Sequence, residues 1–386
     1  MKMKKCFFIS IVAFLLLNSC FNSNNYVFQG KITCKDIPID IYNENIIYRN
    51  QIKDARFVKL ETSDKCQIGE IRKLETTEDR VYILDSDIAE SLFVFKKNGE
   101  FLFKVARKGQ GPGEYFSIND FFIDTINKTI IIFDANIRNL HYYDWEGKFI
   151  RSHSLEKFWF FACCPLDSNT YALDFTKKAL NNKYHLILVD ENNEEYYKSK
   201  HLETDYELAN NFHIAFYKGL NNNIYYTPTR CDTIFNVSSQ GVQDGYRIDF
   251  GKQALPDRFY KKMRKEEQVK ELLKSQYCYG IKNILETEEI LFFNFSFGNN
   301  QLSCFYNKST EDTYSDLLYH PTPKATDNNY FVGFYESYFI NPVIKNEENR
   351  EFVDEWKRYI GEENWNILQS MEDDDNPILV FYKLEI

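Results

Sequence analysis

The sequence predicts an all-β protein: a six-bladed β-propeller with two short helical insertions, preceded by a lipoprotein signal peptide. Three observations carry this prediction. Paired β-rich segments recur at a nearly constant spacing, aromatic residues are abundant, and an apolar N-terminal run ends in a cysteine. Of the 386 residues, 44% are hydrophobic and 17% aromatic, whereas Gly and Pro number only 15 and 9, which excludes collagen-like and largely disordered chains.

The first twenty residues have the layout of an export signal. Three lysines lie among the first five residues, and the apolar run 6–17 that follows is too short to span a bilayer comfortably. It ends in Leu17-Asn18-Ser19-Cys20, which resembles the bacterial lipobox. The resemblance implies that residues 1–19 are removed and that Cys20 receives a diacylglycerol, whose acyl chains anchor the protein. The alternatives are an ordinary signal peptide with an incidental Cys20, or a short buried helix.

Charge and the residues behind Cys20 indicate where the protein acts. The formal net charge is −10 and the isoelectric point about 5.3, so a nucleic-acid partner is excluded because no basic surplus can neutralise phosphates.

The residues after Cys20 are polar, and we expect 20–30 to form a flexible tether. They lack the acidic run typical of lipoproteins displayed on the outside of some Gram-negative cells. We therefore expect an outer-membrane lipoprotein, with the periplasmic face favoured over the cell surface.

The body of the chain repeats a pair of β-rich runs. In residues 81–105 two such runs flank Asn98-Gly99, which predicts a hairpin with a type I′ turn, the turn that needs positive φ at both central residues. The pattern recurs about 48 residues later at 129–149. Weaker copies lie at 171–190, 224–237 and 290–306. Short strands at a fixed period predict propeller blades, and roughly six units fit the chain, with a double-sheet sandwich array as the alternative.

The two strongest copies also match residue by residue. Gly147 stands where Gly99 stood, and Asp134 stands where Asp85 stood, each aspartate closing a strand before a loop. Such a ring must be closed by its two ends, so we expect the final strand, 378–384, to pair with an N-terminal segment near 56–61. The propeller would then occupy residues 31–386.

Two segments interrupt the β pattern with helical spacing. In 256–277 the apolar residues fall at intervals of three and four, and in 350–361 they form one stripe that ends at Gly361, a suitable helix C-cap. We interpret both as helical insertions packed on the propeller.

A glycine-rich loop, Arg107-Lys-Gly-Gln-Gly-Pro-Gly-Glu-Tyr115, follows the first hairpin. With the lipobox, this loop resembles the six-bladed β-propeller lipoproteins of Bacteroidetes, which are similar in pattern to NHL-repeat propellers. The resemblance implies the fold and the location, but most members of that family have no established activity. Two interpretations of the loop stay open. Its glycines would admit a ligand near the central channel, with Arg107, Gln110, Glu114 and Tyr115 as contacts, or they simply let the chain turn between blades.

Motifs for catalysis are absent from the sequence. There is no nucleophile elbow, zinc signature or EF-hand loop, and the neighbouring Cys163 and Cys164 are interpreted as small buried hydrophobes or as a vicinal disulfide. We therefore expect a non-catalytic binding or scaffold module, without a cofactor, for a glycan, a peptide or an envelope protein. The alternative is a metal-dependent hydrolase or lyase with Ca or Zn in the central propeller channel.

Overall fold

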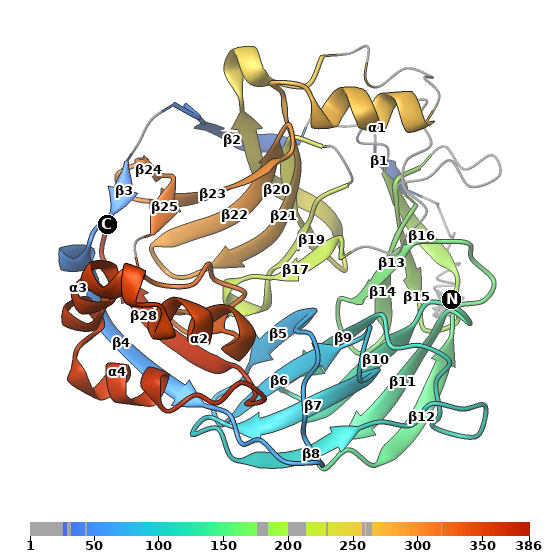
Figure 1. The fold of residues 1–386 in the computed structure, drawn as a ribbon. Coiled ribbons are helices and arrows are strands. Elements are labelled where there is room, and N and C mark those ends of the chain that lie inside the picture. The colour runs from blue at the N-terminus through green and yellow to red at the C-terminus, as the bar shows by residue number, and fades with distance from the viewer. Residues whose placement is uncertain are drawn as a thin grey trace, which may run out of the picture.

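The computed structural model describes residues 26–28, 32–42, 45–175, 184–199, 214–228, 231–256, 259, 265–317 and 319–386. They form a six-bladed β-propeller, seen along its central axis in Figure 1, and the predicted fold is confirmed. Cys20 and the predicted signal peptide lie outside the described residues.

Each blade is an antiparallel sheet whose first strand is innermost. The strands of the first three blades are, in blade 1, β5 (Lys73–Thr76), β6 (Arg80–Asp85), β7 (Ser91–Lys96) and β8 (Phe101–Val105); in blade 2, β9 (Asp120–Asp124), β10 (Thr129–Asp134), β11 (Asn139–Asp144) and β12 (Phe149–Ser154); and in blade 3, β13 (Ala162–Pro165), β14 (Thr170–Asp174), β15 (Leu186–Asp190) and β16 (Glu195–Ser199).

The remaining blades follow the same order. Their strands are, in blade 4, β17 (Phe216–Lys218), β18 (Ile224–Tyr226), β19 (Thr233–Ser238) and β20 (Gly241–Asp249); in blade 5, β21 (Cys278–Glu286), β22 (Ile290–Phe297), β23 (Asn300–Asn307) and β24 (Thr313–Tyr314); and in blade 6, β26 (Ala325–Asp327), β27 (Tyr330–Tyr335), β28 (Ile378–Leu384) and β4 (Ile52–Lys59). The repeated pairs found in the sequence are the second and third strands of blades 2 to 5, and in blade 1 the runs that flank Asn98-Gly99 are the third and fourth strands.

Blade 6 closes the ring with strands from both ends of the chain. Strand β28 pairs antiparallel with β4, with Val380 opposite Phe57 and Ile378 opposite Lys59. The predicted pairing of the final strand is confirmed, although β4 begins and ends a few residues earlier than 56–61. Since the outermost strand of blade 6 comes from the N-terminal segment, unfolding either end removes part of the same sheet.

Short N-terminal strands extend the outer edges of other blades. Strand β2 (Thr33–Pro38) pairs in parallel with β20, and β1 (Tyr26–Phe28) does the same with β16. Strand β3 (Ile46–Ile47) instead pairs with β25 (Asp316–Leu317) in a separate two-stranded sheet. Part of the segment predicted as a flexible tether, 20–30, is therefore a strand here, because the open edge of β16 offers backbone partners that a sequence pattern does not reveal.

The hairpin at Asn98-Gly99 is confirmed, but its turn differs from the predicted type I′. Gly99 has a φ of +91°, whereas Asn98 is not among the residues with positive φ. The amide of Gly99 donates to the carbonyl of Lys96 over 3.0 Å, and β7 and β8 are offset by a register shift between Val94 and Phe95. Gly147 repeats this arrangement in blade 2, with a φ of +77°.

The matching aspartates fix the loops that lead into their blades. The carboxylate of Asp85 is fully buried and accepts hydrogen bonds from four backbone amides, those of Gly69, Glu70, Ile88 and Ala89, at 2.8–3.0 Å. Asp134, also fully buried, accepts from the amide of Phe116 at 2.6 Å and from Ser117. Each carboxylate thus ties the loop that leads into its blade to the end of the second strand.

The helices lie in two insertions. Helix α1 (Lys265–Leu273) falls within the predicted range 256–277, and α3 (Arg350–Ile360) ends at Gly361 as predicted. Two helices were not predicted, α2 (Ser337–Lys345) and α4 (Glu362–Gln369). Pro342 inside α2 removes a backbone donor, which hides this helix from a search by pattern.

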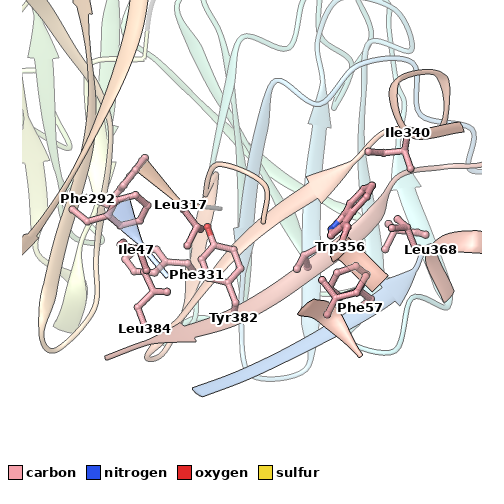
Figure 2. Close-up of a cluster of buried hydrophobic side chains, with 14 of the residues drawn as sticks. Ile47, Phe57, Phe292, Leu317, Phe331, Ile340, Trp356, Leu368, Tyr382 and Leu384 are labelled. Carbon is pink, nitrogen blue, oxygen red and sulfur yellow. The ribbon is translucent and has the colours of Figure 1, made fainter. Parts of the chain in front are cut away.

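Helices α2, α3 and α4 cover blade 6 and share its core. Trp356 of α3 packs edge-on against Trp365 of α4, with ring centroids 6.1 Å apart, and both are buried. Figure 2 shows Trp356 and Leu368 beside Phe57 of β4, and Phe292, Phe331 and Tyr382 within the same cluster. The insertion is therefore integral to blade 6.

Candidate functional site

The centre of the propeller holds a cavity of about 680 Å³. Residues from the inner strands of four blades line it, namely β5, β17, β21 and β26. Three of them, β5, β17 and β21, are labelled around the centre of the ring in Figure 1. A second cavity of about 590 Å³ lies against β5, β9, β13 and β17, and both share Lys73, Glu75 and Tyr217 in their walls. The channel is thus an open space of the size typical of small-molecule sites.

One ion-pair network crosses the wall between the two cavities. The ammonium of Lys73 in β5 lies 2.7 Å from Oδ1 of Asp120 in β9 and 3.0 Å from the carboxylate of Glu75. It also donates to the carbonyl of Phe121 over 2.7 Å. Burial opposes the charge on Lys73, but the carboxylates of Asp120 and Glu75 outweigh it and raise the pKa of this lysine. Lys73 therefore stays charged and fully paired.

A second carboxylate in the channel wall is also paired. Glu286, at the end of β21, is buried and lies 2.9 Å from the ammonium of Lys308. Its other oxygen accepts a hydrogen bond of 3.0 Å from the amide of Leu220, in the turn after β17. Glu286 thereby links blades 4 and 5 and contributes no free negative charge to the cavity.

The remaining charged groups of the larger cavity include a basic cluster, which we define as Arg72, Lys282 and Lys324. Arg72 directly precedes β5, Lys324 directly precedes β26, and Lys282 lies within β21. Among the residues that the structure describes, no carboxylate lies within 4.0 Å of these three cations. Burial, and then the charge of Arg72, lowers the pKa of Lys282, while burial and the charge of Lys282 lower that of Lys324.

Strand β21 is irregular where it carries this cluster. Its pairing with β22 shifts register on both sides of Lys282, and two residues have positive φ, Gly280 at +69° and Asn283 at +53°. The side-chain amide of Asn283 donates from Nδ2 to Oδ1 of Asn294 over 2.9 Å and to the backbone carbonyl of Pro323 over 2.8 Å. Bulges of this kind redirect side chains and are common beside functional sites. Here a run from Gly280 to Glu286 lines the cavity.

The glycine-rich loop lies elsewhere. Arg107, Gln110, Glu114 and Tyr115 are outside the walls of both cavities. Tyr115 is fully buried, and its hydroxyl donates to the carbonyl of Glu90 over 2.8 Å. The carboxylate of Glu114 accepts from the amide of Gly111 over 2.8 Å, and a Cβ on Gly109 would overlap it. These contacts account for the glycines by chain geometry. A ligand role for the four residues stays a prediction.

The sequence did not single out the basic cluster. Its members are separated by about 210 and 40 residues, and each is an ordinary surface-type cation in the sequence. The signal that could have found them is position: Arg72 and Lys324 each stand immediately before the first strand of a blade, where a side chain can reach the channel.

Metal and disulfide chemistry find no site in the described part of the chain. Its residues contain no group of three or more His, Cys, Asp or Glu side chains arranged to hold a metal ion. Cys163 and Cys164 are free and buried in β13, as small hydrophobes rather than a vicinal disulfide. Within the described residues, no helix is long and apolar enough to cross a bilayer.

Comparisons with known proteins support the fold and assign the family. No curated protein matches the chain. A protein of Bacteroides fragilis NCTC 9343 described as exported has a similar structure, with a TM-score of 0.71, 18% identity, and coverage of 92% of this chain and 100% of that one. A DUF4221 family member from Bacteroides vulgatus ATCC 8482 has a TM-score of 0.50 and 10% identity, covering 88% and 99%. The family described as "Domain of unknown function (DUF4934)" matches residues 35–383, and the chain therefore belongs to that family.

Proposed function

We propose that this protein is a lipid-anchored propeller of the cell envelope that binds a ligand in its central channel without transforming it. The observation that carries the proposal is the open cavity of about 680 Å³ at the propeller axis, walled by the inner strands of four blades. A purely architectural ring would gain stability by filling this space with side chains. An open space at the axis, with both polar and apolar residues in its wall, is instead what a binding site requires.

The chemistry of the wall favours binding over catalysis. The carboxylates of Glu75 and Glu286 are held by Lys73 and Lys308, at 3.0 and 2.9 Å. A general base needs a carboxylate that is free to accept a proton from the substrate, and these pairs instead fix the positions of the wall strands. The alternative, a hydrolase or lyase using Ca or Zn, finds no supporting donor set among the described residues.

A glycan is the ligand that best suits the uncharged part of the wall. It carries side-chain amides and hydroxyls, those of Asn221, Asn222, Asn283, Gln301 and Thr326 among them, together with the ring of Tyr217. An amide both donates and accepts hydrogen bonds, as a sugar hydroxyl does, and an aromatic ring packs against the apolar face of a sugar. A peptide or an envelope protein remains an alternative outcome of the test.

The proposed location in the cell rests on the sequence. The lipobox-like Leu17-Asn18-Ser19-Cys20 supports a diacylglycerol anchor on Cys20, and the polar residues behind it support the periplasmic face of the outer membrane. The similarity to a Bacteroides protein described as exported agrees with this location. We also propose that the protein is related to the propeller lipoproteins of Bacteroidetes and to NHL-repeat propellers.

A channel-blocking variant tests the binding function. The protein without residues 1–20 is screened on arrays of glycans and peptides, and Thr326→Trp places a large ring in the cavity wall. Thr313→Trp, on the outer strand β24, is the matched control because it adds the same ring far from either cavity. We expect binding to a glycan that Thr326→Trp abolishes and Thr313→Trp preserves. Equal binding by all three proteins, or turnover of the ligand, contradicts the proposal.

A further inference from the structure

We propose that the channel ligand is anionic: an acidic saccharide whose carboxylate is bound by the basic cluster of Arg72, Lys282 and Lys324. This inference rests on the proposed function, because it names the ligand class of the same cavity. It is carried by an imbalance of charge inside an acidic protein, by the convergence of the three cations from three blades, and by the irregular strand that presents one of them.

The imbalance follows from pairing the charges in the cavity wall. Lys73 is bound by two carboxylates, those of Glu75 and Asp120, and Glu286 is bound by Lys308, all at 2.7–3.0 Å. Lys218 also lines the wall and donates to the carbonyl of Ile123 over 3.4 Å. The cations of the basic cluster have no such partner among the described residues. The whole chain carries a formal charge of −10, so an unpaired positive group at its axis runs against the average of the molecule. A cleft lined by one sign of charge concentrates ligands of the opposite sign.

The three cations come from consecutive blades. Lys282 belongs to blade 5, Lys324 to blade 6 and Arg72 to blade 1, and the inner strand of blade 6 contacts those of both neighbours. All three residues line the same cavity. A single ligand in this space can therefore be reached from three sides, which is the arrangement that fixes an oxyanion in one orientation.

The three cations are exposed residues of the cavity wall, and their charges act on one another. Burial is the largest cause that lowers the pKa of Lys282 and of Lys324. The charge of Arg72 lowers the pKa of Lys282 further, and the charge of Lys282 does the same to Lys324. Glu336, at the start of α2, acts on Lys324 in the opposite direction, but its effect is smaller than those of burial and Lys282. A bound carboxylate would relieve this repulsion, so ligand binding and the charged state of the cluster support each other.

The bulges of β21 are the second structural observation. Gly280 and Asn283 adopt positive φ on either side of Lys282, and the side chain of Asn283 is fixed by Asn294 and the carbonyl of Pro323. A regular strand would pair every residue with β22, whereas this one shifts register on both sides of Lys282. Bulges of this kind redirect side chains and are common beside ligand sites.

Matched pairs of probes separate charge from shape. Binding of tri-galacturonic acid and of its methyl ester, which has the same rings without the negative charges, is measured by calorimetry at low and high salt. We expect the acid to bind more tightly than the ester, and salt to weaken only the acid. Single replacements Arg72→Gln, Lys282→Gln and Lys324→Gln are each expected to weaken the acid about tenfold and leave the ester unchanged.

The control removes three positive charges, more than any single test variant, but outside the cavities. A triple variant of exposed lysines outside both cavities, Lys65→Gln with Lys148→Gln and Lys252→Gln, should bind the acid like the original protein. Circular dichroism of each variant establishes that it is folded. Tri-glutamate and tri-glutamine serve as the peptide pair, for which we expect no binding.

Each outcome decides between the two proposals. Equal affinity for acid and ester, with both lost in Thr326→Trp, overturns the anionic ligand and leaves the channel function standing. Binding of tri-glutamate as tight as that of the sugar acid, and equally dependent on Lys282, overturns the saccharide. Binding unaffected by Thr326→Trp removes the channel function itself.

Discussion

The ammonium of Lys73 in blade 1 lies 2.7 Å from Oδ1 of Asp120 in blade 2, and both side chains are buried at the channel wall. Lys73 also contacts Glu75 on its own strand and lies over the rings of Phe121 and Phe122. This pair joins the inner strands of two neighbouring blades, β5 and β9. Removing this ion pair should therefore lower the free energy of unfolding of the propeller.

Replacing Lys73 by Met should destabilise the protein by about 3 kcal/mol, because it leaves the carboxylate of Asp120 buried without its partner. Urea unfolding followed by tryptophan fluorescence measures the loss. The double variant Lys73→Met with Asp120→Leu should recover much of it, since no uncompensated charge remains. Lys96→Met is the control: its pair with Glu100 is exposed and worth at most about 1 kcal/mol. Equal losses at Lys73 and Lys96 would contradict this role.

Gly99 should tolerate a methyl group far less well than Gly361. Both have positive φ, +91° and +85°, so alanine strains the backbone at each by about 1–3 kcal/mol. A Cβ on Gly99 would also overlap the carbonyl oxygen of Lys59, whereas one on Gly361 meets no atom within 4 Å. We expect Gly99→Ala to cost about 2 kcal/mol more than Gly361→Ala in thermal or urea unfolding. Similar costs would show that the close approach is unimportant.

These two glycines also show how much of the fold the sequence could predict. Hairpins and helix ends are local, so Gly99, Gly147 and Gly361 could be recognised from their neighbours, and the repeat of the hairpins gave the blades and their number. The predicted turn type was wrong because strands β7 and β8 pair with a register shift between Val94 and Phe95. This shift is a property of the strand pairing, and the turn residues alone do not reveal it.

The site could not be predicted in the same way. The cluster of Arg72, Lys282 and Lys324 exists only because the ring closes, and ring closure depends on contacts between residues far apart in the chain. The glycine-rich loop stood out in the sequence because glycines are locally conspicuous. In the structure, however, its buried Tyr115 and the contact between Glu114 and Gly111 explain it by packing.

Stability should decrease as the pH falls from about 7 to 5, in part because of two histidines. Burial lowers the pKa of His141. Burial also lowers the pKa of His153, and this effect is larger than the opposite effect of the hydrogen bond to Asn193. The unfolded chain therefore binds protons below about pH 6.5 that the folded protein does not, and each such proton changes stability by up to about 1.4 kcal/mol per pH unit.

The double variant His141→Gln with His153→Gln tests this assignment. Urea unfolding of the original protein and of the variant is compared at intervals between pH 5 and 7.5. We expect a flatter dependence in the variant, whatever its stability at pH 7.5. A slope as steep as that of the original protein would place the responsible groups elsewhere.

Membrane association should depend on Cys20 alone among the cysteines. The chain is acidic and its described residues include no membrane-spanning helix, so the proposed acyl chains would supply the binding free energy, roughly 0.8 kcal/mol for each buried CH₂. Cys20→Ala should move the full-length protein from the membrane to the soluble fraction and abolish incorporation of labelled palmitate. Cys34→Ala changes another free, partly exposed cysteine and should leave both unchanged. Recovery of Cys20→Ala in the membrane fraction at the original level would refute the anchor, because no other covalent lipid site is proposed for this chain.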